Sequence, residues 1–144
     1  MMKRPTLLCV DDDRATRRFY ETLFDRYGYG VIVASSGHQA LELLHAEGAD
    51  IDAVISDYHM PGMNGAELAA EIKRCQPTLP VIMITGRQPV PEAASRGVDV
   101  ALVKGGPVDR ILDQVAILLG MACKTLTPVT VPLPANGGPR NGPA

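Results

Sequence analysis

The sequence predicts an α/β fold in which a five-stranded parallel sheet is sandwiched between two layers of helices. Three observations predict it. Short apolar runs alternate with stretches of helical periodicity, five such strand–helix units fit into about 120 residues, and the runs are apolar throughout, as in strands buried on both faces. Because crossovers between parallel strands are right-handed, they place helices on both faces and give a doubly wound arrangement.

The first two units lie within residues 7–48. An apolar run at residues 7–10 ends at three aspartates, of which Asp13 can cap a helix that runs to about residue 27 and stops at Gly28. The predicted core face of this helix repeats every four residues: Ala15, Phe19, Leu23 and Tyr27. A second strand at residues 31–34 leads into a helix closed by Gly48, with Ala40, Leu41 and Leu44 on one side.

The third unit surrounds Asp57, which an apolar strand at residues 52–56 delivers to a tight loop containing Pro61 and Gly62. Asn64 or Gly65 then opens a helix that is ended by Pro77, with four residues at helical spacing: Leu68, Ala69, Ile72 and Cys75. Asp57 is therefore expected at the end of a buried strand.

Two further strands follow. The run at residues 80–84 delivers Thr85, and the next helix is expected to be short and to begin near Pro91. The run at residues 98–103 delivers Lys104.

A long last helix follows Pro107, with one apolar stripe: Val108, Ile111, Leu112, Val115, Leu119 and Ala122. Ile117 and Met121 fall partly outside this stripe. They are either the edge of the core or a partner-facing patch, through which a homodimer could form.

Composition narrows the class of protein. The chain has 144 residues with 14 basic and 16 acidic side chains, so neither a nucleic-acid partner nor an anionic membrane has electrostatic support. The apolar run after the N-terminus is far too short for a signal peptide or a membrane span, which favours a cytoplasmic location. The 3 cysteines are widely spaced and are expected to be reduced thiols packed as small apolar groups: Cys9, Cys75 and Cys123.

The composition changes near the C-terminus. Residues 1–123 are expected to form one domain, and residues 124–144 a Pro- and Gly-rich tail that is disordered or extended. A tail of this length cannot hold an output domain, so no DNA-binding output domain is expected.

The first, third, fourth and fifth predicted strands end in residues that can carry chemistry: Asp11 and Asp12, Asp57, Thr85, and Lys104. The carboxyl ends of parallel strands lie at one edge of the sheet, so these side chains are expected to meet in one crevice. Three carboxylates beside one ammonium are unfavourable unless they share a cation. A hard, oxygen-seeking ion such as Mg²⁺ (or Mn²⁺) fits such a site.

A metal held by carboxylates beside a Lys and a Thr suits phosphoryl transfer. Asp57 is the candidate nucleophile, because it stands alone on its strand while Asp11 and Asp12 can hold the metal. Each residue alone has a plainer explanation, as a helix cap, a strand end or a surface charge. Their coincidence at one sheet edge favours the functional interpretation.

These motifs resemble the receiver domain of two-component response regulators, the family that includes the chemotaxis regulator of flagellar switching. The matching segments are residues 8–13, 55–65, 82–86 and 102–104, within a resemblance that covers residues 5 to about 123. It implies a flavodoxin-like sheet with strand order 2-1-3-4-5, in a stand-alone receiver. It also implies that Asp57 takes a phosphoryl group from a histidine kinase or a histidine phosphotransfer protein, and that the chain then signals through a phosphorylation-dependent protein contact.

The resemblance also implies roles for the other residues. Asp12 and Asp57 would bind Mg²⁺ directly, Asp11 would act through a water, and the backbone carbonyl of His59 would complete the protein ligands. Thr85 and Lys104 would contact the phosphoryl oxygens. His59 and Arg87, each two residues beyond a site residue, would tune the lifetime of the phosphate.

Two departures from the family concern the switch. The family commonly has a Pro after its Lys, whereas Lys104 precedes Gly105 and Gly106, and the family's aromatic three residues before that Lys is Ala101 here. The usual coupling between the Thr and this aromatic is therefore not expected.

Three functions remain open at the level of sequence. The first is the phosphoacceptor module, which is not a turnover enzyme. The second is a small phosphatase similar to the haloacid dehalogenase family, although residues 11–15 lack the Thr of its Asp-x-Asp-x-Thr motif. The third is a docking module whose acids take no phosphate.

Overall fold

The computed structural model describes residues 4–47, 50–86 and 97–120. The elements in these ranges are β1 (Thr6–Val10), α1 (Arg14–Arg26), β2 (Gly30–Ala34), α2 (Gly37–Glu47), β3 (Ala53–Asp57), α3 (Gly65–Cys75), β4 (Val81–Thr85), β5 (Val100–Val103) and α4 (Val108–Leu118). All neighbouring strands are parallel, in the order β2-β1-β3-β4-β5. The predicted fold class and strand order are confirmed.

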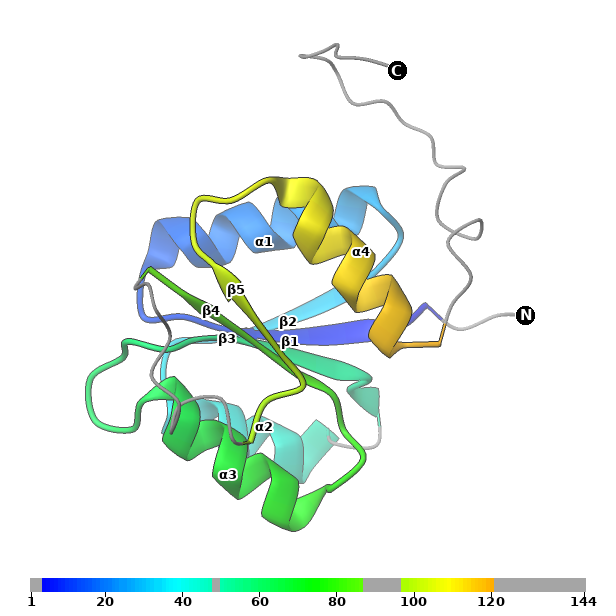
Figure 1. Cartoon of the computed structure of the whole chain (residues 1–144). Coiled ribbons are helices and arrows are strands. Elements are labelled where there is room, and N and C mark those ends of the chain that lie inside the picture. Colours follow the sequence, from blue (N-terminus) through cyan, green and yellow to red (C-terminus); the bar gives the residue numbers. More distant parts are fainter. Residues whose placement is uncertain (1–3, 48–49, 87–96, 121–144) are drawn as a thin grey trace, which may run out of the picture.

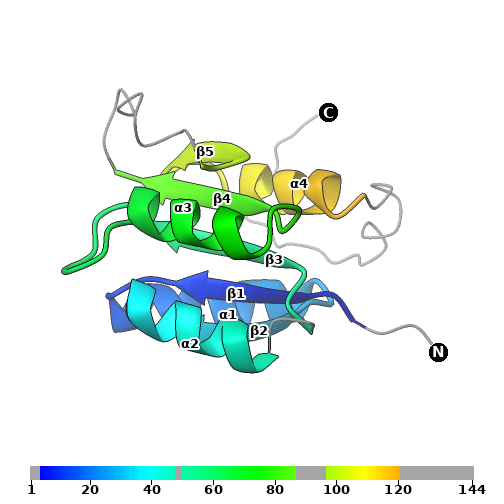
Figure 2. The ribbon, with the colours of Figure 1, turned by 90° about the horizontal axis from the view of Figure 1, so that it is seen from below.

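The sheet is the middle of three layers, with α1 and α4 on one face and α2 and α3 on the other (Figures 1 and 2). Successive residues of β1 point to opposite faces: Leu8 packs in the cluster that contains Leu44 of α2, whereas Leu7 packs in the cluster that contains Phe24 of α1. Both faces of the central strands are therefore buried, which explains why their sequences are apolar throughout.

The capping of α1 follows the prediction, and its packed face follows it in part, since Leu23 and Tyr27 pack against the core as predicted. The carboxylate of Asp13 accepts hydrogen bonds from the backbone N–H of Thr16 at 2.9 Å and from its hydroxyl at 2.7 Å. Tyr20 and Phe24 are buried, whereas Phe19, placed in the core by the four-residue repeat, is 48% exposed. The repeat identified one of two neighbouring apolar rows on α1. The other row, Tyr20 and Phe24, is buried because it packs with Tyr29, which meets the ring of Phe24 edge-on.

Two further predictions are corrected. Cys75 is the last residue of α3 and is exposed rather than packed, whereas Cys9 is buried as expected. The last helix ends at Leu118 and leaves out Leu119, because Gly120 adopts a φ of +73° that stops it, and Ala122 lies outside the described residues. Gly120 was visible in the sequence and could have predicted this earlier end of the helix.

The predictions for the helix near Pro91, for Arg87, and for Met121, Cys123 and the tail lie outside the described residues. In the ranges that are described, every helix is too short or too polar to cross a membrane.

Tyr29 carries a small destabilising defect that can be tested. It is 1% exposed and its hydroxyl has no hydrogen-bond partner in the described structure, and burial raises its pKa to about 12. Tyr29→Phe removes the unsatisfied hydroxyl and keeps the ring contact with Phe24. We expect the free energy of unfolding to rise by about 1 kcal/mol in urea denaturation. Tyr29→Leu, which also removes the ring contact, is the control and should be less stable than the parent; a Tyr29→Phe protein that also loses stability would contradict the prediction.

Candidate functional site

Three carboxylates meet where β1 and β3 end. Asp11 directly follows β1, Asp12 comes next, and Asp57 is the last residue of β3, the strand paired with β1. One carboxylate oxygen from each of the three lies within 4.8 Å of the others. Asp11 and Asp57 are buried, whereas Asp12 is exposed, so the cluster opens to solvent on the Asp12 side. We call these three residues the acidic cluster.

Lys104, which directly follows β5, reaches the acidic cluster. Its ammonium nitrogen lies 3.3 Å from Oδ2 of Asp57 and 3.5 Å from Oδ2 of Asp11. Its backbone N–H donates to the carbonyl of Thr85 at 2.7 Å. Thr85 is the fully buried last residue of β4, beside the end of β3. The structure therefore brings together the acids and the lysine that the sequence predicted, with Thr85 on the adjoining strand.

The backbone around Asp11 is held on several sides. Its N–H donates to the carbonyl of Ala34 at 3.1 Å, and its own carbonyl accepts from the guanidinium of Arg17 at 2.8 Å. Its carboxylate accepts from the N–H of Asp13 at 2.8 Å. Arg17 was missed in the sequence, where nothing distinguishes it from Arg14 and Arg18.

The loop after β3 is tied back to the sheet and to α3. The N–H of Tyr58 donates to the carbonyl of Ile84, and the carbonyl of Tyr58 accepts from Gly65 at 2.8 Å. Asn64 and Glu67 form a reciprocal capping box that starts α3. His59, which stands edge-on to the ring of Tyr58, is exposed. The predicted role of its carbonyl as a metal ligand remains a prediction.

The buried charges of the site oppose one another. Burial raises the pKa of the Asp11 carboxyl, and the charge of Asp57 raises it further, against the hydrogen bond from Asp13 and the charge of Lys104. Burial lowers the pKa of Lys104, but the charges of Asp11 and Asp57 outweigh it, so this pKa is raised. The pKa of Asp11 is higher in the folded protein than in the unfolded chain. The stability that protonated Asp11 contributes is therefore lost as the pH rises through the folded-state pKa. Ionised Asp11 therefore destabilises the metal-free protein at neutral pH.

Asp11→Asn is accordingly expected to stabilise the metal-free protein at pH 7. The variant removes a buried charge whose pKa is raised by burial and by Asp57, while Lys104 keeps its ion pair with Asp57, so we expect a gain of about 1 kcal/mol in urea denaturation. Added Mg²⁺ should stabilise the parent more than the variant, because at one metal concentration the protein that binds the ion more tightly gains more stability. A variant less stable than the parent without metal would contradict this account.

The acidic cluster fits a divalent metal ion. Three carboxylates against one ammonium leave a formal excess of two negative charges, and all the side-chain ligand atoms are oxygens. Mg²⁺ prefers a few carboxylate ligands and retains several waters, which the exposed side of Asp12 admits. The residues that would hold the ion are those of the acidic cluster.

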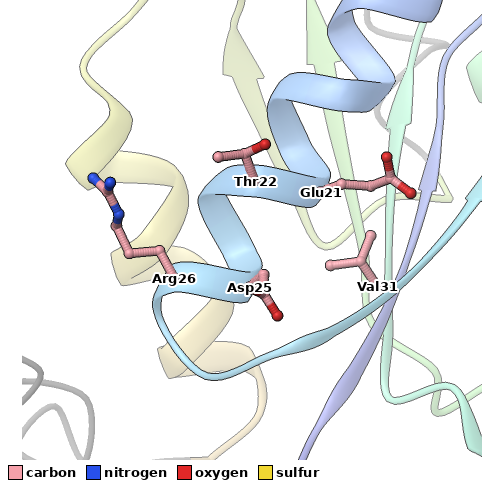
Figure 3. Close-up of a pocket in the computed structure, with 5 residues that line it drawn as sticks. All are labelled: Glu21, Thr22, Asp25, Arg26 and Val31. Atoms are coloured by element: carbon pink, nitrogen blue, oxygen red, sulfur yellow. The ribbon is translucent and has the colours of Figure 1, made fainter.

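Two hollows lie near α1, and only one adjoins the site. A cavity of about 340 Å³ between α1, β5 and α4 is lined by Lys104 and by mainly apolar residues, including Phe19, Tyr20 and Val103. The larger hollow, of about 610 Å³, lies along the second half of α1 and β2 and is lined by Glu21, Thr22, Asp25, Arg26 and Val31 (Figure 3). Lys104 lines the smaller cavity, whereas neither Lys104 nor a residue of the acidic cluster lines the larger hollow, so it is the smaller cavity that adjoins the site.

Known proteins resemble this chain in sequence. A family model for the response regulator receiver domain matches residues 7–116. The transcriptional regulatory protein GlrR of Escherichia coli is 39% identical over 107 residues, which are 72% of this chain and 23% of that protein. The chain thus spans less than a quarter of the length of this relative.

Solved structures agree with these matches. A response regulator receiver domain protein from Clostridium thermocellum has a TM-score of 0.76 at 25% identity, covering 81% of this chain and 94% of that one. The response regulator protein TrrA from Thermotoga maritima, solved in complex with Mg(2+)-BeF, has a TM-score of 0.74 at 28% identity, covering 79% and 98%.

Proposed function

The chain belongs to the response regulator receiver domain family, and we propose that it is a phosphoacceptor that takes a phosphoryl group onto Asp57. Receiver domains of two-component systems are signalling modules rather than turnover enzymes. The observation that best supports the proposal is the placement of Asp57 within 3.3 Å of Lys104 and within the acidic cluster. TrrA, whose fold this chain shares, was solved with magnesium and a beryllium fluoride.

In the proposed reaction a carboxylate oxygen of Asp57 attacks the phosphorus of a phosphohistidine on a histidine kinase or a histidine phosphotransfer protein. The new O–P bond makes an acyl phosphate, the N–P bond breaks, and its electron pair stays on the imidazole, which takes a proton from water. Lys104, already beside Asp57, and Thr85 contact the phosphoryl oxygens and stabilise their charge.

Mg²⁺ (or Mn²⁺) is the proposed cofactor, and it supplies charge neutralisation at the phosphoryl oxygens when bound. Asp12 and Asp57 would hold it directly, Asp11 through a water, and the carbonyl of His59 would complete the protein ligands. We also propose that His59 and Arg87 tune the lifetime of the phosphate.

Phe19 and Val103, both exposed, flank the cavity beside Lys104 and would meet the phosphate donor.

The proposed output is a phosphorylation-dependent contact with another protein. Ile117 on α4 is 58% exposed, which supports the homodimer through the last helix. In this proposal residues 1–123 act as the receiver domain and residues 124–144 as a tail.

Incubation with phosphoramidate, followed by intact-mass measurement with and without Mg²⁺, tests this function. We expect one phosphoryl group per chain, with Mg²⁺ required. Many turnovers of p-nitrophenyl phosphate without a lasting adduct would instead favour the phosphatase, and a protein that neither labels nor turns over substrate would favour the docking module.

A further inference from the structure

The backbone makes a tight turn where β5 ends. The N–H of Gly106 donates to the carbonyl of Val103 at 3.3 Å, which closes a four-residue turn with Lys104 second and Gly105 third. Gly105 has a φ of +83°. A type II turn has a φ of about +80° at its third position, which glycine adopts far more readily than other residues. The turn therefore depends on glycine at position 105.

Apart from the ion pairs of its ammonium group with Asp57 and Asp11, Lys104 is held by this backbone. Its N–H is fixed to Thr85, but its side chain is 37% exposed, and the cavity of about 340 Å³ lies against Lys104, Gly105 and Gly106. Little packing on that side would keep the turn in place. The direction in which the Lys104 side chain leaves the strand is consequently set by the conformation of the turn.

The open space around Gly105 allows the effect of backbone conformation to be distinguished from the effect of side-chain packing. A Cβ atom added at Gly105 would have no atom within 4 Å, so the Cβ itself meets no obstacle and acts through φ. A proline, which the family commonly has after its Lys, fixes φ at about −65° and cannot adopt this turn. This chain thus positions the lysine with a backbone conformation that the family's proline does not allow.

We propose that Gly105 is a positioning residue, whose left-handed conformation aims the ammonium of Lys104 at Asp57 and Asp11. The proposal rests on the proposed function, because it assigns how that site is assembled. The family residue, introduced as Gly105→Pro, is accordingly expected to impair this chain.

A substitution series at position 105 tests the proposal by the rate of labelling with phosphoramidate and Mg²⁺. Asn tolerates positive φ better than Ala, and Ala better than the β-branched Val. We expect Gly105→Asn to label close to the parental rate, Gly105→Ala more slowly, and Gly105→Val nearly as slowly as Lys104→Gln, about 10²–10³-fold below the parent. Equal rates across the series would overturn the proposal.

Gly28 provides the matched control. It has a φ of +91°, also has no atom within 4 Å of an added Cβ, and lies at the opposite edge of the sheet, where β2 begins. The same substitutions at Gly28 should lower stability to a similar extent in urea denaturation and leave the labelling rate unchanged. A loss of labelling at Gly28 equal to that at Gly105 would show that general destabilisation is the cause.

A double-mutant cycle shows whether Gly105 acts through Lys104. In a Lys104→Gln background, Gly105→Val should slow labelling no further, and an additive loss would overturn the proposal. If the parent protein takes no label, the proposed function fails, but the same cycle on the free energy of unfolding of the metal-free protein still tests the positioning. Coupling between positions 104 and 105 then supports it, and additivity overturns it.

Discussion

Asp57→Asn is expected to take up no phosphoryl group from phosphoramidate, even at saturating Mg²⁺. Asparagine preserves the size of the side chain, and its amide oxygen can still accept from Lys104, but the amide lacks the nucleophilic oxygen anion. The variant should remain folded, because it removes one of two buried negative charges that lie near each other. Intact mass measures the loss of labelling, and thermal unfolding without metal measures stability.

Asp52→Asn is the matched control for this result. Asp52 is exposed, precedes β3, and accepts a hydrogen bond from the N–H of Thr6 at 2.8 Å, far from the acidic cluster in the strand register. It should label as the parent does. A phosphoryl adduct on Asp57→Asn would move the acceptor role to Asp11 or Asp12 and contradict the assignment.

Gly65→Ala is expected to destabilise the fold strongly. A Cβ at Gly65 would collide with the carbonyl oxygen of Asp57 and lie 2.8 Å from Cα of Tyr58. Both are backbone atoms, and the N–H of Gly65 is bonded to Tyr58 at 2.8 Å, so relief requires moving the end of β3 or the start of α3. Overpacking usually costs about 1–3 kcal/mol, and we expect at least the upper value here because side-chain rearrangement cannot relieve the collision.

Urea denaturation followed by circular dichroism measures the effect, with Gly62→Ala as the control in the same loop. Gly62 has a φ of +79° and no atom within 4 Å of an added Cβ, so alanine there pays only for its conformation, about 1–2 kcal/mol. Gly65 has no positive φ, so alanine there acts through the collision, and a Gly65→Ala protein no less stable than Gly62→Ala would contradict the prediction.

The sequence predicted the parts of this molecule that depend on local patterns. The central strands β1, β3 and β4 were recognisable because burial on both faces requires an apolar run, as at residues 81–84. The acidic cluster was predictable because parallel strands present their carboxyl ends at one edge, so Asp11 and Asp57 had to be neighbours once β1 and β3 were paired. The strand order itself came from the family resemblance.

Features that depend on long-range packing were beyond the sequence. The choice between Phe19 and Tyr20 for the buried row of α1 depends on the contact with Tyr29, which no local pattern reveals. The hydrogen bond from Arg17 to Asp11 and the collision that requires glycine at position 65 both depend on elements meeting in three dimensions. The Gly105 turn was visible only as a departure from the family.

The positions of β3 and β5 in the sheet give the two sides of the site unequal protection against local unfolding. β3 lies between β1 and β4 with all five residues buried, whereas β5 pairs with β4 alone and is partly exposed. Amide protons of β3 should therefore exchange with deuterated solvent only on global unfolding, and those of β5 by smaller, more frequent openings. Asp57 should then keep its position during local openings of β5 that move Lys104 away. The reactive arrangement of the two residues is therefore expected to be lost and restored by motion of Lys104.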